Sequence, residues 1–273
     1  MELERLSPKQ FERFQAFIYD TCGIMLDRAK ITLVSNRIRR RLKAGNFADF
    51  DAYYNHLISK PGQVEIEGFL DAITTNETFY FRTATHFEWL KEEYVKELVT
   101  AKSTGLRQSS LRIWSAACSS GEEPYSIAMC LSEASNQLRG WETYILGTDI
   151  SETSLVTART GTYRERAFRD MDQSRLDRYF VRSDENWHLK PSIAKMVQFK
   201  YHNLLKPMRE PPFDCIFVRN VLIYFDRASK TKVIENLVRA LVPGGYLVVG
   251  PSEGIYDMLG MLTKHTSFLY QKP

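Results

Sequence analysis

Short apolar segments alternate with helical segments after residue 110, and this pattern restricts the fold more than any other feature of the chain. The apolar segments cover 111–117, 143–150, 195–203, 214–220 and 244–250. Helical patterns over 124–135 and 227–241 lie among them. Because strands that alternate with helices form βαβ units, we expect an α/β domain with a mostly parallel sheet. An apolar segment at 266–272 predicts one more strand.

The first 70 residues show helical periodicity and no strand pattern. A capping box at Ser7, with proline at the first helical position, begins a helix that ends at Gly23. Further helices are expected after Asp27 up to Gly45, over 48–59, over 63–73 and over 86–99. We therefore expect a small all-helical domain over 1–70, a linker over 71–85, and the α/β domain over 86–273, with a small antiparallel β insertion near 178–200.

The composition favours a folded cytoplasmic protein. With 273 residues, of which 44% are hydrophobic, the chain can bury a substantial core. Its apolar runs are far shorter than the roughly 18 residues of a membrane span, and residues 1–10 contain no apolar signal segment. The four cysteines lack the spacing of zinc sites, and the five histidines form no metal-binding motif. We expect reduced, mostly buried cysteines and no metal site.

The stretch RIWSAACSSGEEP, residues 112–124, reads as a strand, a turn of small residues and the start of a helix. Ligands of open α/β sheets bind at such turns. This turn lacks the glycine patterns of dinucleotide and P-loop sites, and Glu122 and Glu123 repel phosphate. S-adenosylmethionine avoids that repulsion, because it carries an ammonium group and a sulfonium but no phosphate. Ala116 and its small neighbours allow the backbone to approach such a ligand.

Asp149 follows the second apolar segment, where Rossmann-like folds bind ribose hydroxyls. Each acidic residue also has a structural interpretation: the two glutamates as partners of the helix dipole, and Asp149 as a helix cap. Singly, the two interpretations weigh about equally. The combination of these three acidic residues with the small-residue turn favours a cofactor site.

The segment TNETFYFR, residues 75–82, places three consecutive aromatic residues before Arg82. Such aromatics can cover a sulfonium by cation–π attraction, and Arg82 can pair with a carboxylate. The alternative is a hydrophobic hinge between domains with a surface arginine. Polar residues after later strands are further candidates: Asn203 and Leu204 for adenine, and Arg219 and Asn220.

Together, the stretches TTNETFYFR, WSAACSSGEEPYSIA, TDIS, YHNLL and FVRNVLIYF resemble the chemotaxis receptor methyltransferases, the CheR family, over essentially the whole chain. The resemblance implies a Rossmann-like class I methyltransferase domain that uses S-adenosylmethionine to methylate glutamates on the cytoplasmic helices of chemoreceptors. It implies cofactor contacts at Asn76, Thr78, Arg82, Glu122 or Glu123, Asp149, Asn203, Leu204, Arg219 and Asn220. Arg82 and Tyr224 match the residues proposed to orient the acceptor or its carboxylate.

Some members of this family hold a receptor-tail peptide on the β insertion. The corresponding loop, RSDENWHLKPS, is short in this chain, so we do not expect that docking.

Positive charge is concentrated near the N-terminus. Residues 1–60 contain 11 Lys and Arg against 7 Asp and Glu, whereas the rest of the chain has 26 of each. Lys30, Arg37 and Arg41 fall along one side of the second expected helix, with Arg40 beside them. Such a face suits an acidic receptor surface, although an ordinary solvated face is the alternative.

Methyl transfer to glutamate needs no catalytic base, because a carboxyl group with an unperturbed pKa of about 4.3 is ionised at neutral pH. Two other functions stay open. One is a nucleic-acid methyltransferase in which NRIRRRLK contacts phosphates, although no nucleic acid is expected as a partner. The other is a signalling module that binds the cofactor without catalysis.

Overall fold

The computed structural model describes residues 5–273. The expected start of the helical domain at Met1, and the first four residues of the N-terminal stretch without a signal segment, lie outside the described residues. The helical domain (residues 5–73) contains α1 (Pro8–Cys22), α2 (Ile31–Ala44), α3 (Phe50–Leu57) and α4 (Glu65–Ile73), with 3-10 turns at Arg28–Lys30 and Pro61–Val64. The expected cap forms: the Ser7 hydroxyl accepts a hydrogen bond from the Gln10 N–H, and Gly23 ends α1 in the left-handed conformation. The helices continue to Ile73, three residues past the expected boundary.

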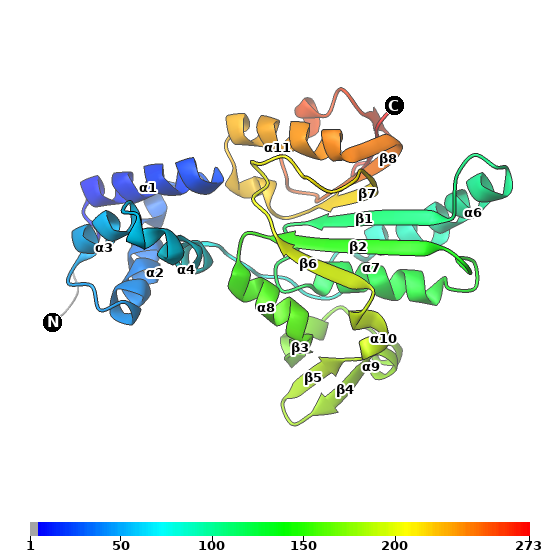
Figure 1. Ribbon diagram of the computed structural model, residues 1–273, viewed down its shortest axis with the longest axis horizontal. Helices are drawn as coiled ribbons and strands as arrows, with labels where there is room; N and C mark the ends of the chain where they lie inside the picture. Colours follow the sequence, from blue (N-terminus) through cyan, green and yellow to red (C-terminus); the bar gives the residue numbers. More distant parts are fainter. Residues whose placement is uncertain (1–4) are drawn as a thin grey trace.

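A core of aromatic and aliphatic side chains holds these four helices together. Phe14 of α1, Tyr53 of α3 and Phe69 of α4 are at most 1% exposed, and their rings pack within 6.3 Å of one another. In Figure 1 this domain lies to the left of the sheet, at the end toward which β1 and β2 point.

The larger domain is built on a sheet that has, within residues 5–273, the strand order β6-β2-β1-β7-β8-β10-β9. The strands are β1 (Ser110–Ala116), β2 (Glu142–Asp149), β6 (Val197–Tyr201), β7 (Phe213–Val218), β8 (Leu241–Val249), β9 (Thr263–Lys264) and β10 (Leu269–Gln271). The first five in this order are parallel, β10 is antiparallel to β8, and β9 is antiparallel to β10. The prediction of a mostly parallel sheet is confirmed.

Both faces of this sheet are covered, as its apolar strands require. Alternate residues of β7 point to opposite faces: Cys215 and Phe217 join one core, whereas Ile216 and Val218 join the other. The first core includes side chains of α5 (Ala84–Trp89), the π-helical turn Leu90–Tyr94, α6 (Val95–Ser103) and α7 (Glu122–Glu133). The second core packs against α11 (Arg227–Ala240). Another helix, α8 (Glu152–Thr160), follows β2.

A small antiparallel sheet with the order β3-β5-β4 lies below the main domain in Figure 1. Its strands are β3 (Thr162–Tyr163), β4 (Phe180–Ser183) and β5 (Asn186–Leu189), and η4 (Glu165–Phe168), α9 (Gln173–Tyr179) and α10 (Pro191–Ala194) accompany it. We call residues 162–194 the insertion. Its first strand precedes the expected range of 178–200, and residues from Val197 onward belong to the large sheet. Short strands of two residues carry little sequence pattern, which is why β3 was not expected.

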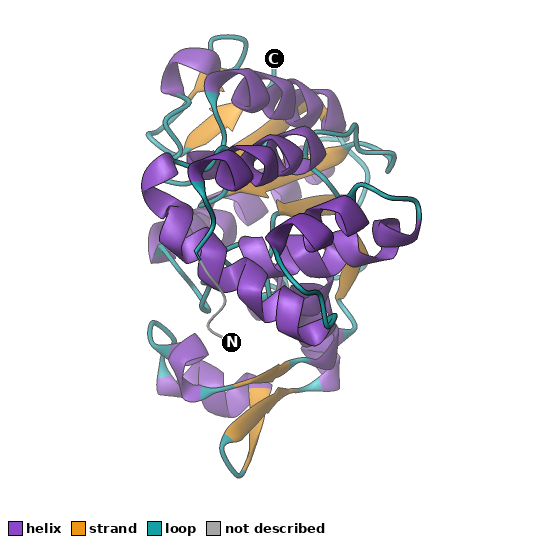
Figure 2. Ribbon diagram, turned by 90° about the vertical axis from the view of Figure 1, so that its left-hand side faces the viewer, coloured by secondary structure: helices purple, strands orange, loops and turns teal. Residues whose placement is uncertain are grey.

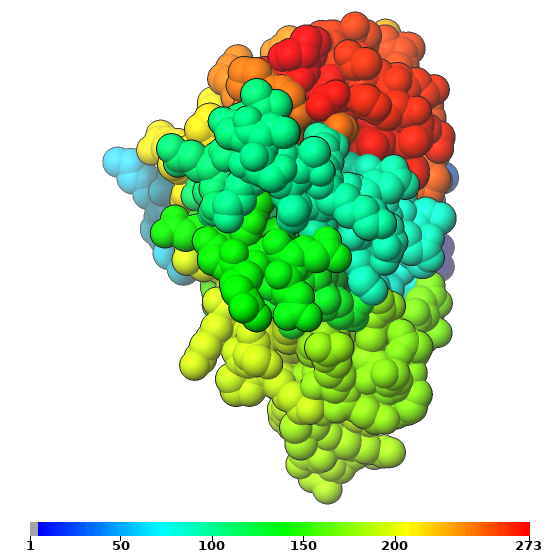
Figure 3. Space-filling view, turned by 90° about the vertical axis from the view of Figure 1, so that its right-hand side faces the viewer, coloured from blue at the N-terminus to red at the C-terminus, as the bar shows by residue number. Residues whose placement is uncertain are grey.

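The insertion protrudes from the larger domain both in Figure 2, viewed from the side of the helical domain, and in Figure 3, viewed from the opposite side. The linker, residues 74–83, runs without helix or strand from α4 to α5. In the described part of the chain, none of the helices combines the length and the apolar character that crossing a membrane requires.

Candidate active site

A cavity lies at the carboxyl ends of β1, β2, β6 and β7, between the larger domain, the helical domain and the linker. This is the edge where ligands of parallel sheets bind. From β1, the strand order continues through β2 and β6 on one side and through β7 and β8 on the other. The cavity is lined by residues that include Lys30, Arg37, Asn76, Glu77, Thr78, Phe79, Arg82, Ala117, Cys118, Ser119, Glu123, Asp149, His202, Asn203, Leu204, Arg219, Asn220 and Tyr224.

The turn between β1 and α7 has an unusual backbone. Ala117, Ser119 and Gly121 all have positive φ angles, of 66°, 49° and 92°. Glycine is required at position 121 for two reasons. Its φ of 92° favours glycine, and a Cβ at this position would lie 2.8 Å from the Cβ of Ala158 in α8. Such a conformation persists only when its surroundings hold it in place.

Asp149, at the end of β2, is part of what holds the turn. Its carboxylate accepts hydrogen bonds from the backbone N–H of Ser119, at 2.7 Å, and of Ser151, at 2.9 Å. Burial raises the pKa of this carboxyl group, and the backbone hydrogen bonds oppose that shift. Ser151, not Asp149, caps α8 with its side chain. Each carboxylate oxygen keeps a second lone pair for a ligand hydroxyl.

The two neighbouring glutamates have different environments. Glu123 lines the cavity, and its oxygens accept hydrogen bonds from the Ser115 hydroxyl at 2.7 Å and from Arg219 at 2.9 Å. Glu122 does not line the cavity; it is buried beneath the turn, where it accepts a hydrogen bond from the Ser120 hydroxyl at 2.8 Å. Burial raises the pKa of Glu122 to about 7. Of the two, only Glu123 is placed to meet a ligand.

Arg219, at the end of β7, joins the cavity wall to the linker. Its side chain is 1% exposed and donates both to Glu123 and to the main-chain oxygen of Arg82. Burial lowers the pKa of the Arg219 guanidinium, and the adjacent Glu123 carboxylate opposes that effect. Through these two hydrogen bonds Arg219 holds Glu123 and the linker together, and among residues 5–273 its buried Nε has no hydrogen-bond partner.

Glu253, which sequence reasoning missed, supports the neighbouring loop. It is fully buried and accepts hydrogen bonds from the N–H groups of Asn220 and Leu222. These bonds hold Asn220 at a φ angle of 57°, so that it faces the cavity. The only sequence signal was an acidic residue shortly after an apolar strand, which is too common to be decisive.

The linker is fixed to the larger domain by Asn76. Its side-chain amide donates to the hydroxyls of Ser151, at 3.1 Å, and Ser154, at 2.8 Å. Its main-chain oxygen accepts a hydrogen bond of 3.0 Å from Ser119 in the β1–α7 turn. Thr78, next but one along the linker, lines the cavity.

Of the three consecutive aromatic residues in the linker, Phe79 alone lines the cavity. Tyr80 and Phe81 are buried in the core of the larger domain, so of the three rings only that of Phe79 is placed to cover a ligand in the cavity. Arg82 lies 5.4 Å from the centre of the Phe79 ring and donates to the main-chain oxygen of Glu77 at 3.1 Å. Its guanidinium therefore lies in the cavity wall, partly exposed.

Other expected site residues also connect the two domains. The Asn203 amide donates to the main-chain oxygen of Thr21 in α1 at 2.8 Å, and the Tyr224 main-chain oxygen accepts from Met25 at 2.8 Å. Leu204 lies beside Asn203 in the cavity lining. Ala116 is fully buried in β1 and does not line the cavity; the next residue, Ala117, does.

Two of the four arginine and lysine side chains expected to dock a partner are used within the chain. Arg41 forms a two-pronged ion pair with Glu65, at 2.8 and 2.7 Å. Arg37 donates to the linker, including the Thr75 hydroxyl at 3.0 Å, and also lines the cavity with Lys30. Arg40 is exposed.

All four cysteines are free and buried. No cluster of three His, Cys, Asp or Glu side chains suited to a metal occurs in the portion of the chain that is described. The cavity instead offers two carboxylates, the partly buried Glu123 and the buried Asp149, beside a turn of small residues whose Ala117 and Ser119 line it. These groups fit the ammonium and ribose hydroxyls of S-adenosylmethionine.

A mostly parallel sheet with both faces covered and a cavity at its strand ends is the architecture of S-adenosylmethionine-dependent methyltransferases, among other α/β proteins. Residues 76–268 match the family profile described as "CheR methyltransferase, SAM binding domain", and residues 9–74 match "CheR methyltransferase, all-alpha domain". The chain therefore belongs to the CheR methyltransferase family, and its cofactor is S-adenosylmethionine.

Relatives of similar length support this assignment. The chain is 37% identical over 270 residues to "Chemotaxis protein methyltransferase Cher2" of Pseudomonas putida, covering 96% of this chain and 97% of the relative. It is 38% identical to "Chemotaxis protein methyltransferase 1" of Pseudomonas aeruginosa, covering 91% of both chains. It is 37% identical to "Chemotaxis protein methyltransferase" of Escherichia coli, covering 97% of this chain and 91% of the relative.

Proposed function

We propose that this protein transfers a methyl group from S-adenosylmethionine to glutamate side-chain carboxylates of methyl-accepting chemoreceptors, forming methyl esters in sensory adaptation. The observation that carries the proposal is the division of charge in one cavity. The carboxylates of Asp149 and of Glu123, which is paired with Arg219, lie on the side of the strand ends. Lys30, Arg37 and Arg82 lie on the side of the helical domain and the linker, where the acidic lining residue Glu77 is paired with Arg169. A cationic methyl donor suits the first side and an anionic acceptor suits the second.

On the acidic side, Glu123 would bind the ammonium group of the cofactor, and Asp149 the ribose hydroxyls. Asn203 and Leu204 would border the adenine, with Asn220, Asn76 and Thr78 completing the wall. Because Arg219 and Ser115 already hold Glu123 in place, its carboxylate needs no rearrangement to receive a ligand. The bound cofactor supplies an electrophilic methyl group on its sulfonium.

On the other side, Arg82 would orient the acceptor carboxylate. Among residues 5–273 its guanidinium makes one hydrogen bond, to the main-chain oxygen of Glu77, so its other N–H groups are available to the acceptor. Tyr224 lies in the same lining and would position the acceptor with it. The carboxylate arrives ionised, so the residues act by alignment and by exclusion of water, and proton removal is not required.

The helical domain would bind the receptor next to the cavity. Lys30 and Arg37 line the cavity, and Arg40 is exposed on the same helix, so an acidic receptor helix would be attracted by all three. The protein would then act in the cytoplasm and reach the membrane through the receptor alone. The connection between β4 and β5 is a turn at Asp184–Glu185, which gives no support to docking of a receptor-tail peptide.

The test is incubation with S-adenosylmethionine labelled on its methyl group and with chemoreceptor-containing membranes. We expect label in the receptor that mild alkali releases as methanol. Receptors whose methylatable glutamates are replaced by alanine are the matched control and should stay unlabelled. Alkali-stable label in added RNA or DNA would instead support the nucleic-acid alternative, and cofactor binding without any transfer would support the non-catalytic one.

A further inference from the structure

The insertion is attached to the walls of the cofactor site, although it protrudes from the domain (Figure 3). Arg169 of the insertion touches the cavity lining directly, 3.4 Å from the Glu77 carboxylate and 3.6 Å from the centre of the Phe79 ring. Three further sets of contacts are made to residues that do not line the cavity. They reach the β1–α7 turn, the linker and the carboxyl-terminal part of α7.

The first contact is made by Tyr163 of β3. Its side chain is 4% exposed, and its hydroxyl donates a 2.8 Å hydrogen bond to the main-chain oxygen of Ser120. Ser120 stands between Ser119 and Gly121, both at positive φ, and Ser119 is the residue whose N–H binds Asp149. The Tyr163 hydroxyl therefore holds the strained turn through a residue that does not line the cavity.

The second contact joins the insertion to the linker through Tyr80. The N–H of Tyr80 donates to the main-chain oxygen of Ala167 in η4 at 2.9 Å. Its ring stacks on Phe168 at 5.4 Å and meets Tyr163 and Phe180 edge-on. A residue of the linker is thus part of the core of the insertion, two positions before Arg82.

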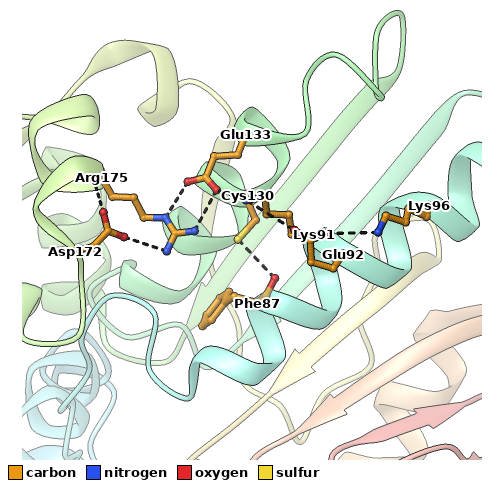
Figure 4. Close-up of polar contacts among 8 residues, drawn as sticks. All are labelled: Phe87, Lys91, Glu92, Lys96, Cys130, Glu133, Asp172 and Arg175. Carbon is orange, nitrogen blue, oxygen red and sulfur yellow. Dashed lines mark hydrogen bonds and ion pairs between the residues drawn. The ribbon is translucent and has the colours of Figure 1, made fainter.

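The third contact is an ion-pair network around Glu133 at the end of α7, shown in Figure 4. Arg175 of α9 donates to both oxygens of Glu133, at 2.8 and 3.1 Å, and Lys91 of the π-helical turn lies 3.0 Å from the same carboxylate. The Arg175 guanidinium also lies over the ring of Phe81, 4.3 Å from its centre. Arg175 therefore fixes the residue immediately before Arg82.

We propose that Tyr163 and Arg175 are positioning residues, which hold the β1–α7 turn and the linker in the geometry that binds the cofactor and so couple the insertion to the cavity. Tyr163 acts through Ser120, and Arg175 acts through Phe81. Binding energy shared between two regions is reciprocal, so cofactor binding must also stabilise the insertion. The proposal concerns cofactor binding and does not depend on which acceptor is methylated.

Tyr163→Phe and Arg175→Met test the two contacts. Loss of one hydrogen bond to a partly buried carbonyl, or of the two-pronged pair, should weaken the binding of S-adenosylhomocysteine about three- to tenfold in titration calorimetry. The KM for S-adenosylmethionine should rise by a similar factor, with the KM for the acceptor unchanged. Arg175→Lys keeps the charge and should recover part of the affinity.

Matched controls come from the same insertion. Tyr179 is also buried, and among residues 5–273 its hydroxyl has no hydrogen-bond partner, so Tyr179→Phe should bind S-adenosylhomocysteine as the unchanged protein does. Arg178 of the same helix is exposed, and Arg178→Met should likewise have no effect. Equal affinity in the test and control variants would overturn the proposal.

A measurement on the unchanged protein keeps the proposal testable even if a variant fails to fold. Hydrogen exchange followed by mass spectrometry should show slower exchange over 162–180 when S-adenosylhomocysteine is added. Protection limited to the segments that line the cavity would show that the insertion and the site are independent, and would overturn the coupling.

Discussion

Replacing Glu123 with glutamine separates two properties of this residue, its hydrogen bonds and its negative charge. The amide is nearly isosteric: its oxygen can accept from Arg219, and its NH₂ group can donate to the Ser115 hydroxyl. The hydrogen bonds are therefore retained and the negative charge is lost. What remains is the Arg219 guanidinium, 1% exposed, without its carboxylate partner, itself 13% exposed.

The expected loss of stability follows from that burial. Removing one partner of a buried ion pair costs about 3 to 5 kcal/mol, and since the hydrogen bonds persist in this variant we expect the lower value, about 3 kcal/mol. For a domain of this size, that lowers the unfolding temperature by roughly 6 to 12 °C. The pKa of Arg219, which burial already lowers, should fall further without Glu123.

The double variant Glu123→Gln with Arg219→Met provides the decisive comparison. It removes the unpaired charge, so the unfolding free energy from urea titration should return to within about 1 kcal/mol of the starting value. Binding of S-adenosylhomocysteine, measured by calorimetry, should stay weak in both variants, because the partner of the ammonium group is absent. A double variant that binds as the unchanged protein does would refute the assignment of Glu123, and a single variant of unchanged stability would refute the account of the ion pair.

Three further predictions concern the turn, the neighbouring glutamate and the acceptor side. Gly121→Ala should abolish binding of S-adenosylhomocysteine, because the new Cβ would lie 2.8 Å from that of Ala158. The control Gly140→Ala, at a φ of 78° in open space, should impose similar backbone strain and leave that binding unchanged. Similar affinity for S-adenosylhomocysteine in both variants would contradict the argument. Glu122 has its pKa raised from 4.5 to about 7, so its contribution to stability is complete below pH 4.5 and is lost as the pH rises through 7. Between pH 5 and pH 8, the free energy of unfolding from urea titrations should therefore fall by about 3 kcal/mol less in Glu122→Gln than in the unchanged protein. Glu88→Gln, at an exposed residue, is the control. The same pH dependence in both variants would contradict the burial of Glu122. Arg82→Ala should lower turnover on receptor membranes about a hundredfold while changing the affinity for S-adenosylhomocysteine far less. The control Arg209→Ala, outside the cavity, should change neither quantity. Unchanged turnover with lost affinity for S-adenosylhomocysteine would make Arg82 a cofactor ligand.

The sequence by itself determined the secondary structure and the edge of the sheet at which the site forms. Apolar periodicity is a local property, so the helices of the first 73 residues and the strands β1, β2, β6, β7, β8 and β10 could be predicted along the chain without the fold, whereas their order in the sheet was not predicted. Because parallel strands share one carboxyl edge, Asp149, Asn203 and Arg219 had to meet there once a parallel sheet was expected. Their grouping in one lining follows from topology alone.

The tertiary structure decided the direction in which each side chain of these motifs points. Glu122 and Glu123 differ by 100° around one helix, and only the packing of α7 turns Glu123 to the cavity and Glu122 into the interior. In the linker, Tyr80 and Phe81 are buried because the insertion and α7 offer them partners from distant parts of the chain. Arg41 pairs with Glu65, and Tyr163 reaches Ser120, for the same reason: such contacts depend on how remote elements pack, and no local pattern encodes them.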